Sequence, residues 1–321
     1  MKNQVTADPK EYDVTKRRPQ VLLFGNGMVR AAGGPSWAEL ITGLVAKDKH
    51  LDEKWIQNLP TPILADALFS PNDTSRQNDY FNALVKQDNI CSDAMIELLQ
   101  IPFDAILTTN YTHELENIFR QYMHKRSTKS RTCRAPEQRF VVRLYNQVEK
   151  GPQIWHIHGD IDKKSSIILS HDEYQRANAK IVEYNKQRRN DYCTYAHNLK
   201  FKSWFDYFMM GDVYIIGCGF DYAESDLWWL LNRRKREKAQ EVGKIVYYDP
   251  NDKLDHPNKV DERRLKHEVM TELGIECKDL GVFVRGGTDT EKNEDYHTFY
   301  HAAVQDIRAR VAARCTGEIA E

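Results

Sequence analysis

Four short apolar runs in this sequence end in residues that could contact a ligand. Residues 21–24 lead into Gly25-Asn26-Gly27, and residues 213–216 lead into the segment from Gly217 to Asp221. Residues 105–107 lead into Thr108-Thr109-Asn110, and residues 154–157 lead into His158-Gly159-Asp160. The carboxyl ends of the strands in an open parallel sheet form a ligand crevice. The four runs therefore predict one site that is assembled from distant parts of the chain.

His158 and Asn110 are the residues best suited to chemistry at such a site. Histidine titrates near neutral pH, so His158 could accept a proton during a reaction. Asn110 cannot take a proton, but its amide could position a water molecule or a sugar hydroxyl. A histidine and an asparagine near a phosphate-binding turn suit cleavage of a nucleotide at its sugar. A lone histidine is more often structural, and it is the position of His158 among matching strand ends that favours catalysis.

The segment after residue 24 has the pattern of a phosphate-binding turn. A strand and a glycine-rich turn precede a helix expected from Trp37, with Ser36 as its N-cap and Glu39 completing a capping box. Backbone N–H groups at a helix N-terminus favour anions. The dinucleotide fingerprint has a third glycine where this chain has Arg30, so a purely structural turn stays an equal alternative.

Other catalytic patterns are weaker. Ser36 and His158 could act together as a hydrolase pair, but the chain has no GxSxG elbow. The sequence contains no HExxH and no Walker loop. Strand alternation places His156 on the same face as His158 and places Trp155 and Ile157 on the other. No motif supports His156, so His158 is the preferred base.

The alternation of apolar runs with helical periodicity predicts an α/β fold with a mostly parallel, Rossmann-like sheet and helical insertions. Further strands are expected at residues 140–144, 167–169, 245–248 and 282–284. We expect a polar N-terminal tail at 1–18, one domain at 19–314 and a C-terminal tail at 315–321. Helical insertions are expected at about 38–102 and 172–210, where they would cover one end of the sheet.

Composition excludes several classes of protein. The 321 residues carry 46 Lys and Arg against 47 Asp and Glu, so no global charge favours nucleic acid or membrane. The six cysteines lack metal-site spacing, and no signal peptide or membrane-length apolar run is present. We therefore expect a cytoplasmic protein without a metal. The basic residues at 124–139 are expected to form a solvated loop, with contact to a nucleotide phosphate or an acidic partner as the alternative.

Taken together, the motifs resemble the sirtuin-like superfamily, in particular the prokaryotic sirtuin-like domains of anti-phage systems that consume NAD. The resemblance covers residues 20–305 and includes Gly33-Gly34-Pro35-Ser36-Trp37 and Thr108-Thr109-Asn110-Tyr111-Thr112. It implies a Rossmann-like NAD site with Asn110 and His158 as catalytic residues and with NAD as the substrate. The binding residues that it implies are Gly25, Asn26, Gly27, Met28, Thr108, Thr109, Gly159, Asp160, Gly217, Cys218, Gly219, Phe220 and Asp221.

The resemblance also implies a biological role. The chain would be an NAD hydrolase that depletes NAD in abortive infection, as a homo-oligomer or with a separately encoded partner. Because it has no room for a fused sensor domain, we expect activation in trans by that partner or by a nucleotide signal. The opening Gly-Asn-Gly is also similar to the AbiH-type abortive-infection branch.

Two departures keep other functions open. The family's serine and aspartate are replaced by Val29 and Thr112, which leaves a nucleotide-binding pseudoenzyme or regulatory subunit as the first alternative. A protein deacylase is the second, although deacylating sirtuins usually carry a four-cysteine zinc module that this chain lacks. NADP or another nucleotide also stays open as the ligand.

Overall fold

The computed structural model describes residues 10–36, 39–41, 43, 59–69, 75–85, 90–125, 127–131, 145–148, 151–194, 196–222, 224–237, 242–252, 257–284 and 289–316. Several expectations lie outside these residues. They are the helix start at Trp37, the strand at 140–144, much of the basic loop, and the outer parts of both tails.

An eight-stranded sheet forms the centre of the molecule. Its strands are β2 (Gln20–Phe24), β3 (Ala105–Thr108), β4 (Ser127–Arg131), β5 (Tyr145–Val148), β6 (Gln153–His156), β8 (Asp212–Ile216), β9 (Ile245–Tyr248) and β11 (Ile275–Lys278). Their order is β11-β9-β8-β2-β3-β6-β5-β4. The six strands from β11 to β6 are parallel, whereas β5 and β4 add antiparallel at one edge. The predicted α/β class with a mostly parallel sheet is confirmed.

The strand order reverses next to β2. From β2 the chain builds outward through β3 to β6, and it then returns to place β8, β9 and β11 on the other side. Such a switch point opens a crevice outside the carboxyl ends of the two strands that flank it, here β2 and β8. Both strands are buried along their whole length, because helices cover both faces of the sheet.

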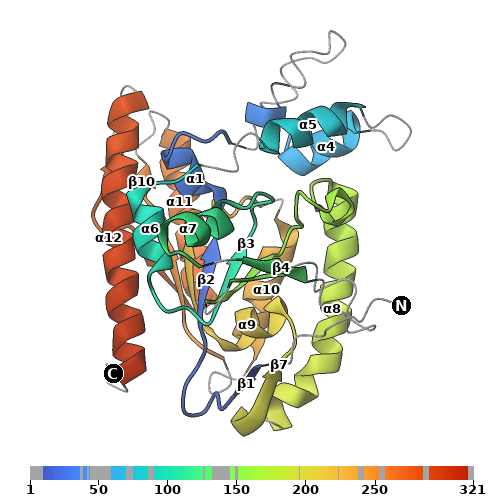
Figure 1. Cartoon of the computed structure of the whole chain (residues 1–321), viewed down its shortest axis with the longest axis vertical. Helices are drawn as coiled ribbons and strands as arrows, with labels where there is room; N and C mark the ends of the chain where they lie inside the picture. The colour runs from blue at the N-terminus through green and yellow to red at the C-terminus, as the bar shows by residue number, and fades with distance from the viewer. Residues whose placement is uncertain are drawn as a thin grey trace.

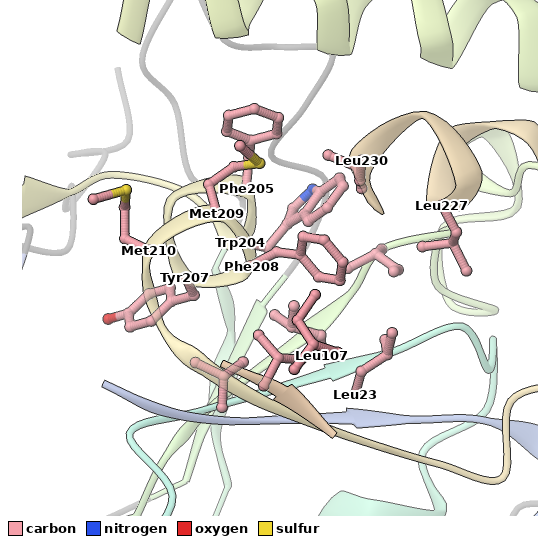
Figure 2. Packing of buried hydrophobic residues seen from close by; sticks show 14 of the residues in the cluster. Leu23, Leu107, Trp204, Phe205, Tyr207, Phe208, Met209, Met210, Leu227 and Leu230 are labelled. Carbon is pink, nitrogen blue, oxygen red and sulfur yellow. The ribbon is translucent and has the colours of Figure 1, made fainter. Parts of the chain in front are cut away.

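One face of the sheet is covered by α8 (His171–Thr194), α9 (Trp204–Met210), α10 (Ser225–Arg236) and α11 (Pro257–Glu272). Figure 2 shows Phe208 of α9 on the side of the helix that faces Leu23 of β2 and Leu107 of β3, in the same buried cluster. All seven residues of α9 are buried, and a capping box between Ser203 and Asp206 fixes its start. A two-stranded antiparallel sheet of β1 (Lys10–Tyr12) and β7 (Leu199–Phe201) lies on this side, and β7 directly follows the short 3-10 helix η3 (Ala196–Asn198).

The other face is covered by α1 (Asn26–Ala31), α6 (Asp93–Leu99), α7 (Glu114–Tyr122) and α12 (Asp289–Thr316). In Figure 1 the long α12 runs down this side of the molecule. Its Phe299, Val304 and Ile307 are fully buried against the sheet. A short parallel pair, β10 (Asn251–Asp252) and β12 (Phe283–Val284), lies before α12 in the chain.

A third cluster covers the carboxyl ends of β3 and β6. Helices α4 (Thr61–Leu68) and α5 (Ser75–Val85), side by side in Figure 1, pack through Leu64, Leu68 and Tyr80 on residues that follow those strands. This pair thus lies at the end of the sheet where a ligand would bind. The expected boundaries of the domain and its insertions stay predictions. Among the described helices, none is long and apolar enough to cross a membrane.

Two sequence expectations are wrong in detail. Residues 167–169 form no strand; they follow the 3-10 helix η2 (Lys164–Ser166) as irregular backbone. A hydrogen bond from Ile168 N–H to the carbonyl of His158 joins them to the segment after β6. His156 and His158 do not share a face, because β6 ends at His156 and the chain turns before His158. His156 faces α7, whereas His158 contacts α8 and α10.

Candidate active site

A cavity of about 910 Å³ opens outside the carboxyl ends of β2 and β8. It lies between the glycine-rich segments, the loops that follow β3 and β6, and the tyrosines of α12. Its lining residues are Asn26, Gly27, Arg30, Ala31, Gly33, Gly34, Ser36, Glu39, Thr61, Pro62, Thr109, Tyr111, His158, Leu169, Tyr174, Gly217, Cys218, Gly219, Asp221, Glu224, Tyr248, Asp249, Pro250, Asn293, Tyr296 and Tyr300.

The floor of the cavity is formed where two glycine segments touch. The N–H of Gly27 donates to the carbonyl of Gly217 at 2.7 Å, and Gly217 has a φ of +71°. A Cβ atom on Gly27 would lie 2.8 Å from that carbonyl oxygen, which is closer than packing allows. Helix α1 begins at Asn26, directly after β2, where the sequence predicted only a turn. The predicted capping box is present, with Ser36 N–H donating to Glu39 and Glu39 N–H donating to Ser36.

His158 lies in the cavity wall and is held from two sides. Its Nε2 is 2.9 Å from Oδ2 of Asp226, in the first turn of α10. Its Nδ1 is 3.5 Å from the hydroxyl of Tyr174 on α8. The next residue, Gly159, has a φ of +105°, and a Cβ there would lie 2.4 Å from the carbonyl of Ser166. The turn that aims His158 at the cavity therefore requires glycine.

Asn110 is close in sequence to the cavity wall but does not line it. The side chain is buried, and its Nδ2 donates to Oε1 of Glu114 at 2.5 Å. Its Oδ1 has no hydrogen-bond partner among the described residues. The neighbouring residues Thr109 and Tyr111 do face the cavity. The structure therefore brings the Asn110 segment to the site while the amide itself points into the protein.

Behind this segment lies a buried cluster of two histidine–carboxylate pairs. His156 contacts Glu116 through Nε2 at 2.9 Å, and His113 contacts Asp160 at 3.0 Å. Burial disfavours the charged ring, but Glu116 outweighs it and raises the pKa of His156 to about 10. The Asp160 hydrogen bond likewise outweighs burial and raises the pKa of His113 to about 9.

The same cluster is the one described group whose geometry could hold a metal ion. Ligand atoms of His113, His156 and Asp160 lie within 4.8 Å of one another. In this structure each of them already takes part in an ion pair with an opposite charge. The cluster is thus held together by its own charges, and the residues fit an ion-pair network.

The predicted binding residues divide into two groups. Seven line the cavity: Asn26, Gly27, Thr109, Gly217, Cys218, Gly219 and Asp221. Six are buried beneath or beside it: Gly25, Met28, Thr108, Gly159, Asp160 and Phe220. Asp160 belongs to the ion-pair cluster and lies outside the cavity lining.

Sequence reasoning missed several cavity residues. Glu224 lines the cavity, and burial raises the pKa of its carboxyl to about 7. Asp249 follows β9 directly, so the strand-end rule could have found it. Burial alone would raise the pKa of Asp249. The hydrogen bond with His267 and the cations Lys266 and Arg263 outweigh burial, so the pKa is lowered overall. Tyr296 and Tyr300 reach the cavity from α12, although no motif marked these two tyrosines as cavity residues.

Comparisons with known proteins agree with this fold. Residues 104–272, just over half of the chain, match the model of the SIR2-like domain. The chain is also similar to the NAD(+) hydrolase ThsA of Enterococcus faecium, with 23% identity over 278 residues. That similarity covers 82% of this chain and 50% of the ThsA protein, so the chain spans about half the length of this relative.

Proposed function

The chain belongs to the family of SIR2-like domains, and from that premise we propose that it is an NAD hydrolase that cleaves the nicotinamide–ribose bond. The observation that carries the proposal is His158, which is paired with Asp226 in the wall of the cavity at the switch point of the sheet. The cavity volume lies within the range of roughly 300–1,000 Å³ that small-molecule and cofactor pockets occupy.

The proposed reaction adds water to the sugar carbon that carries nicotinamide. The carbon–nitrogen bond breaks, its electron pair neutralises the pyridinium ring, and the oxygen of water bonds to the sugar carbon. The water proton passes to His158, and the products are nicotinamide, ADP-ribose and a proton. Glycine backbone at Gly27 and Gly217 would let the pyrophosphate approach the ends of β2 and β8 closely.

We propose Asn110 as the second catalytic residue, which would act only after its side chain changes conformation. Its amide would have to leave Glu114 and rotate toward the cavity to position the attacking water or a ribose hydroxyl. Binding of the nucleotide or of an activating partner would supply this rotation. Such a requirement is consistent with a hydrolase that is inactive until it is triggered.

We further propose that the protein depletes NAD as an effector of anti-phage abortive infection and is activated in trans. This proposal is supported by the resemblance of the chain's motifs to those of sirtuin-like defence proteins and by the chain's similarity to an NAD(+) hydrolase. A homo-oligomer, a separately encoded partner or a nucleotide signal would each provide the activation.

Two observations favour a second candidate function. The Asn110 amide points away from the cavity, and Val29 and Thr112 replace the family's serine and aspartate. A protein with these features would bind NAD or a related nucleotide without cleaving it, as a regulatory subunit of a defence complex.

The test is to incubate the purified chain with NAD, alone and with the product of the neighbouring gene, and to measure nicotinamide by chromatography. Calorimetric titration with NAD runs in parallel. Release of nicotinamide supports the hydrolase, whereas binding without release supports the nucleotide-binding module. Release that requires an acyl-lysine peptide would support a deacylase.

A further inference from the structure

We propose that Asp226 is a positioning residue that fixes the proton of the His158 ring on Nε2, so that Nδ1 accepts the proton of the attacking water. The role in turnover rests on the proposed hydrolase function. The arrangement of the two side chains does not, since it follows from the geometry of the pair alone.

The pair is short and shielded from solvent. Nε2 of His158 is 2.9 Å from Oδ2 of Asp226, and the two side chains are 3% and 2% exposed. An ionised carboxylate can only accept hydrogen bonds, so Nε2 must carry the hydrogen. In the neutral ring the lone pair is then on Nδ1, which is the only nitrogen able to take a proton.

The edge of the ring that carries Nδ1 is directed toward Tyr174, whose side chain lines the cavity. The two rings meet edge to face, with centroids 5.3 Å apart and an interplanar angle of 82°. Burial raises the pKa of Tyr174 well above its ordinary value, so its hydroxyl stays protonated, and the attacking water must displace its long 3.5 Å contact to reach Nδ1. Tyr174 and Asp226 thus hold opposite edges of the ring.

The proposed proton transfer is balanced. As the oxygen of water bonds to the sugar carbon, one of its protons moves to Nδ1 and the ring becomes an imidazolium. The Asp226 carboxylate accepts the hydrogen bond from Nε2 and stabilises that cation, which later releases its proton to solvent. Asp226 is not among the residues that line the cavity, so it acts through His158.

Other titratable groups face the same ring. Glu224 and Asp226 approach from the start of α10, and Tyr174 approaches from α8. Tyr111, from the loop after β3, interacts electrostatically with Tyr174. Glu224 lines the cavity and itself titrates near neutrality. A pH profile must therefore separate Glu224 from His158, and Glu224→Gln does so.

The kinetic test compares Asp226→Asn, Asp226→Glu and the wild type in nicotinamide release. We expect kcat to fall about 100-fold in Asp226→Asn with KM changed less than about threefold, since an aspartate-to-asparagine change disturbs the ring proton without disturbing binding. The acidic limb of the pH–rate profile should move to lower pH, also in the Glu224→Gln background. Asp226→Glu should recover part of kcat, and the exposed Asp172→Asn is the matched control.

A second measurement is independent of turnover. Nitrogen-15 NMR of the histidine rings should show hydrogen on Nε2 of His158 in the wild type at a pH where the ring is neutral. Hydrogen on Nδ1, or an unchanged kcat in Asp226→Asn, would overturn the proposal. If the Nε2 proton is found but NAD is not cleaved under any activating condition, the hydrolase fails while the positioning of the ring stands.

Discussion

At the scale of single residues, the buried histidine–carboxylate cluster explains how the Asn110 segment is held. His156 contacts the carbonyl of Asn110 through Nδ1 at 2.9 Å and Glu116 through Nε2 at 2.9 Å. Both partners are acceptors, so both ring nitrogens carry hydrogen and the ring is an imidazolium. A charged side chain in the interior therefore anchors the backbone next to the proposed site.

This pair makes stability depend on pH. The folded-state pKa of His156 is raised to about 10 from an ordinary value of about 6.5. Its contribution is fully present below pH ~6.5 and is lost as pH rises through ~10. The free energy of unfolding from urea titrations should therefore fall between pH 7 and pH 10. The fall should be smaller in Glu116→Gln, and an equal fall in both proteins would contradict this account.

Arg30 is the one lysine or arginine among the described residues that line the cavity, which is also lined by the carboxylates of Glu39, Asp221, Glu224 and Asp249. Because NAD carries two phosphate charges, we expect this guanidinium to bind them. Arg30→Ala should raise KM for NAD about tenfold, the loss expected from one charge-assisted hydrogen bond, and leave kcat within about twofold.

A substrate without phosphate provides the control for this prediction. Nicotinamide riboside has no phosphate, so Arg30→Ala should not change its cleavage. The exposed Arg264→Ala, on α11, should behave as wild type with both substrates. An equal loss for NAD and nicotinamide riboside would exclude a phosphate contact by Arg30.

At the scale of elements, the contact between the ends of β2 and β8 depends on glycine. A Cβ on Gly27 would lie 2.7 Å from the hydroxyl of Tyr300 and 2.8 Å from the carbonyl of Gly217. Gly27→Ala should therefore lower the free energy of unfolding by about 1–3 kcal/mol, as overpacking does. Gly43→Ala, where a Cβ meets none of the described residues within 4 Å, should not destabilise the protein. Equal stability of the two variants in urea would contradict the close contact.

The strands were the part of the fold that could be predicted best. Residues 21–24, 105–107 and 213–216 are continuous apolar runs that end in glycine or small polar residues, which is typical of buried parallel strands. Helix α1 was missed because it has only six residues and starts on Asn-Gly. The run at 167–169 forms no strand and is apolar because Ile167 and Leu169 pack with α4 and α5, whereas Ile168 packs against α8.

The partners within the site could be predicted less well. His158 was chosen because it follows an apolar run, but Asp226 is 68 positions away and resembled an ordinary residue of a first helical turn. Alternation placed His156 and His158 on one face, and it failed because the strand ends between them. Such contacts depend on where the chain leaves a strand. Tertiary packing decides that position, and it cannot be predicted from the local sequence pattern.

At the scale of the whole molecule, one topological feature gathers the site. Because β2 is central and the chain builds first to one side and then to the other, four strand ends separated by nearly 200 positions border a single crevice. The predicted likeness to sirtuin-like proteins is confirmed by the SIR2-like match, whereas the likeness to the AbiH-type branch stays a prediction.

The most direct test of the central claim measures nicotinamide release from NAD by wild type and His158→Ala side by side, with the neighbouring gene product present. The exposed His197→Ala, in η3, is the matched control. We predict release by the wild type and by His197→Ala, with a loss of at least about 100-fold in His158→Ala, as expected for removal of a general base. Release that persists in His158→Ala, or no release by the wild type under any activating condition, would contradict the account.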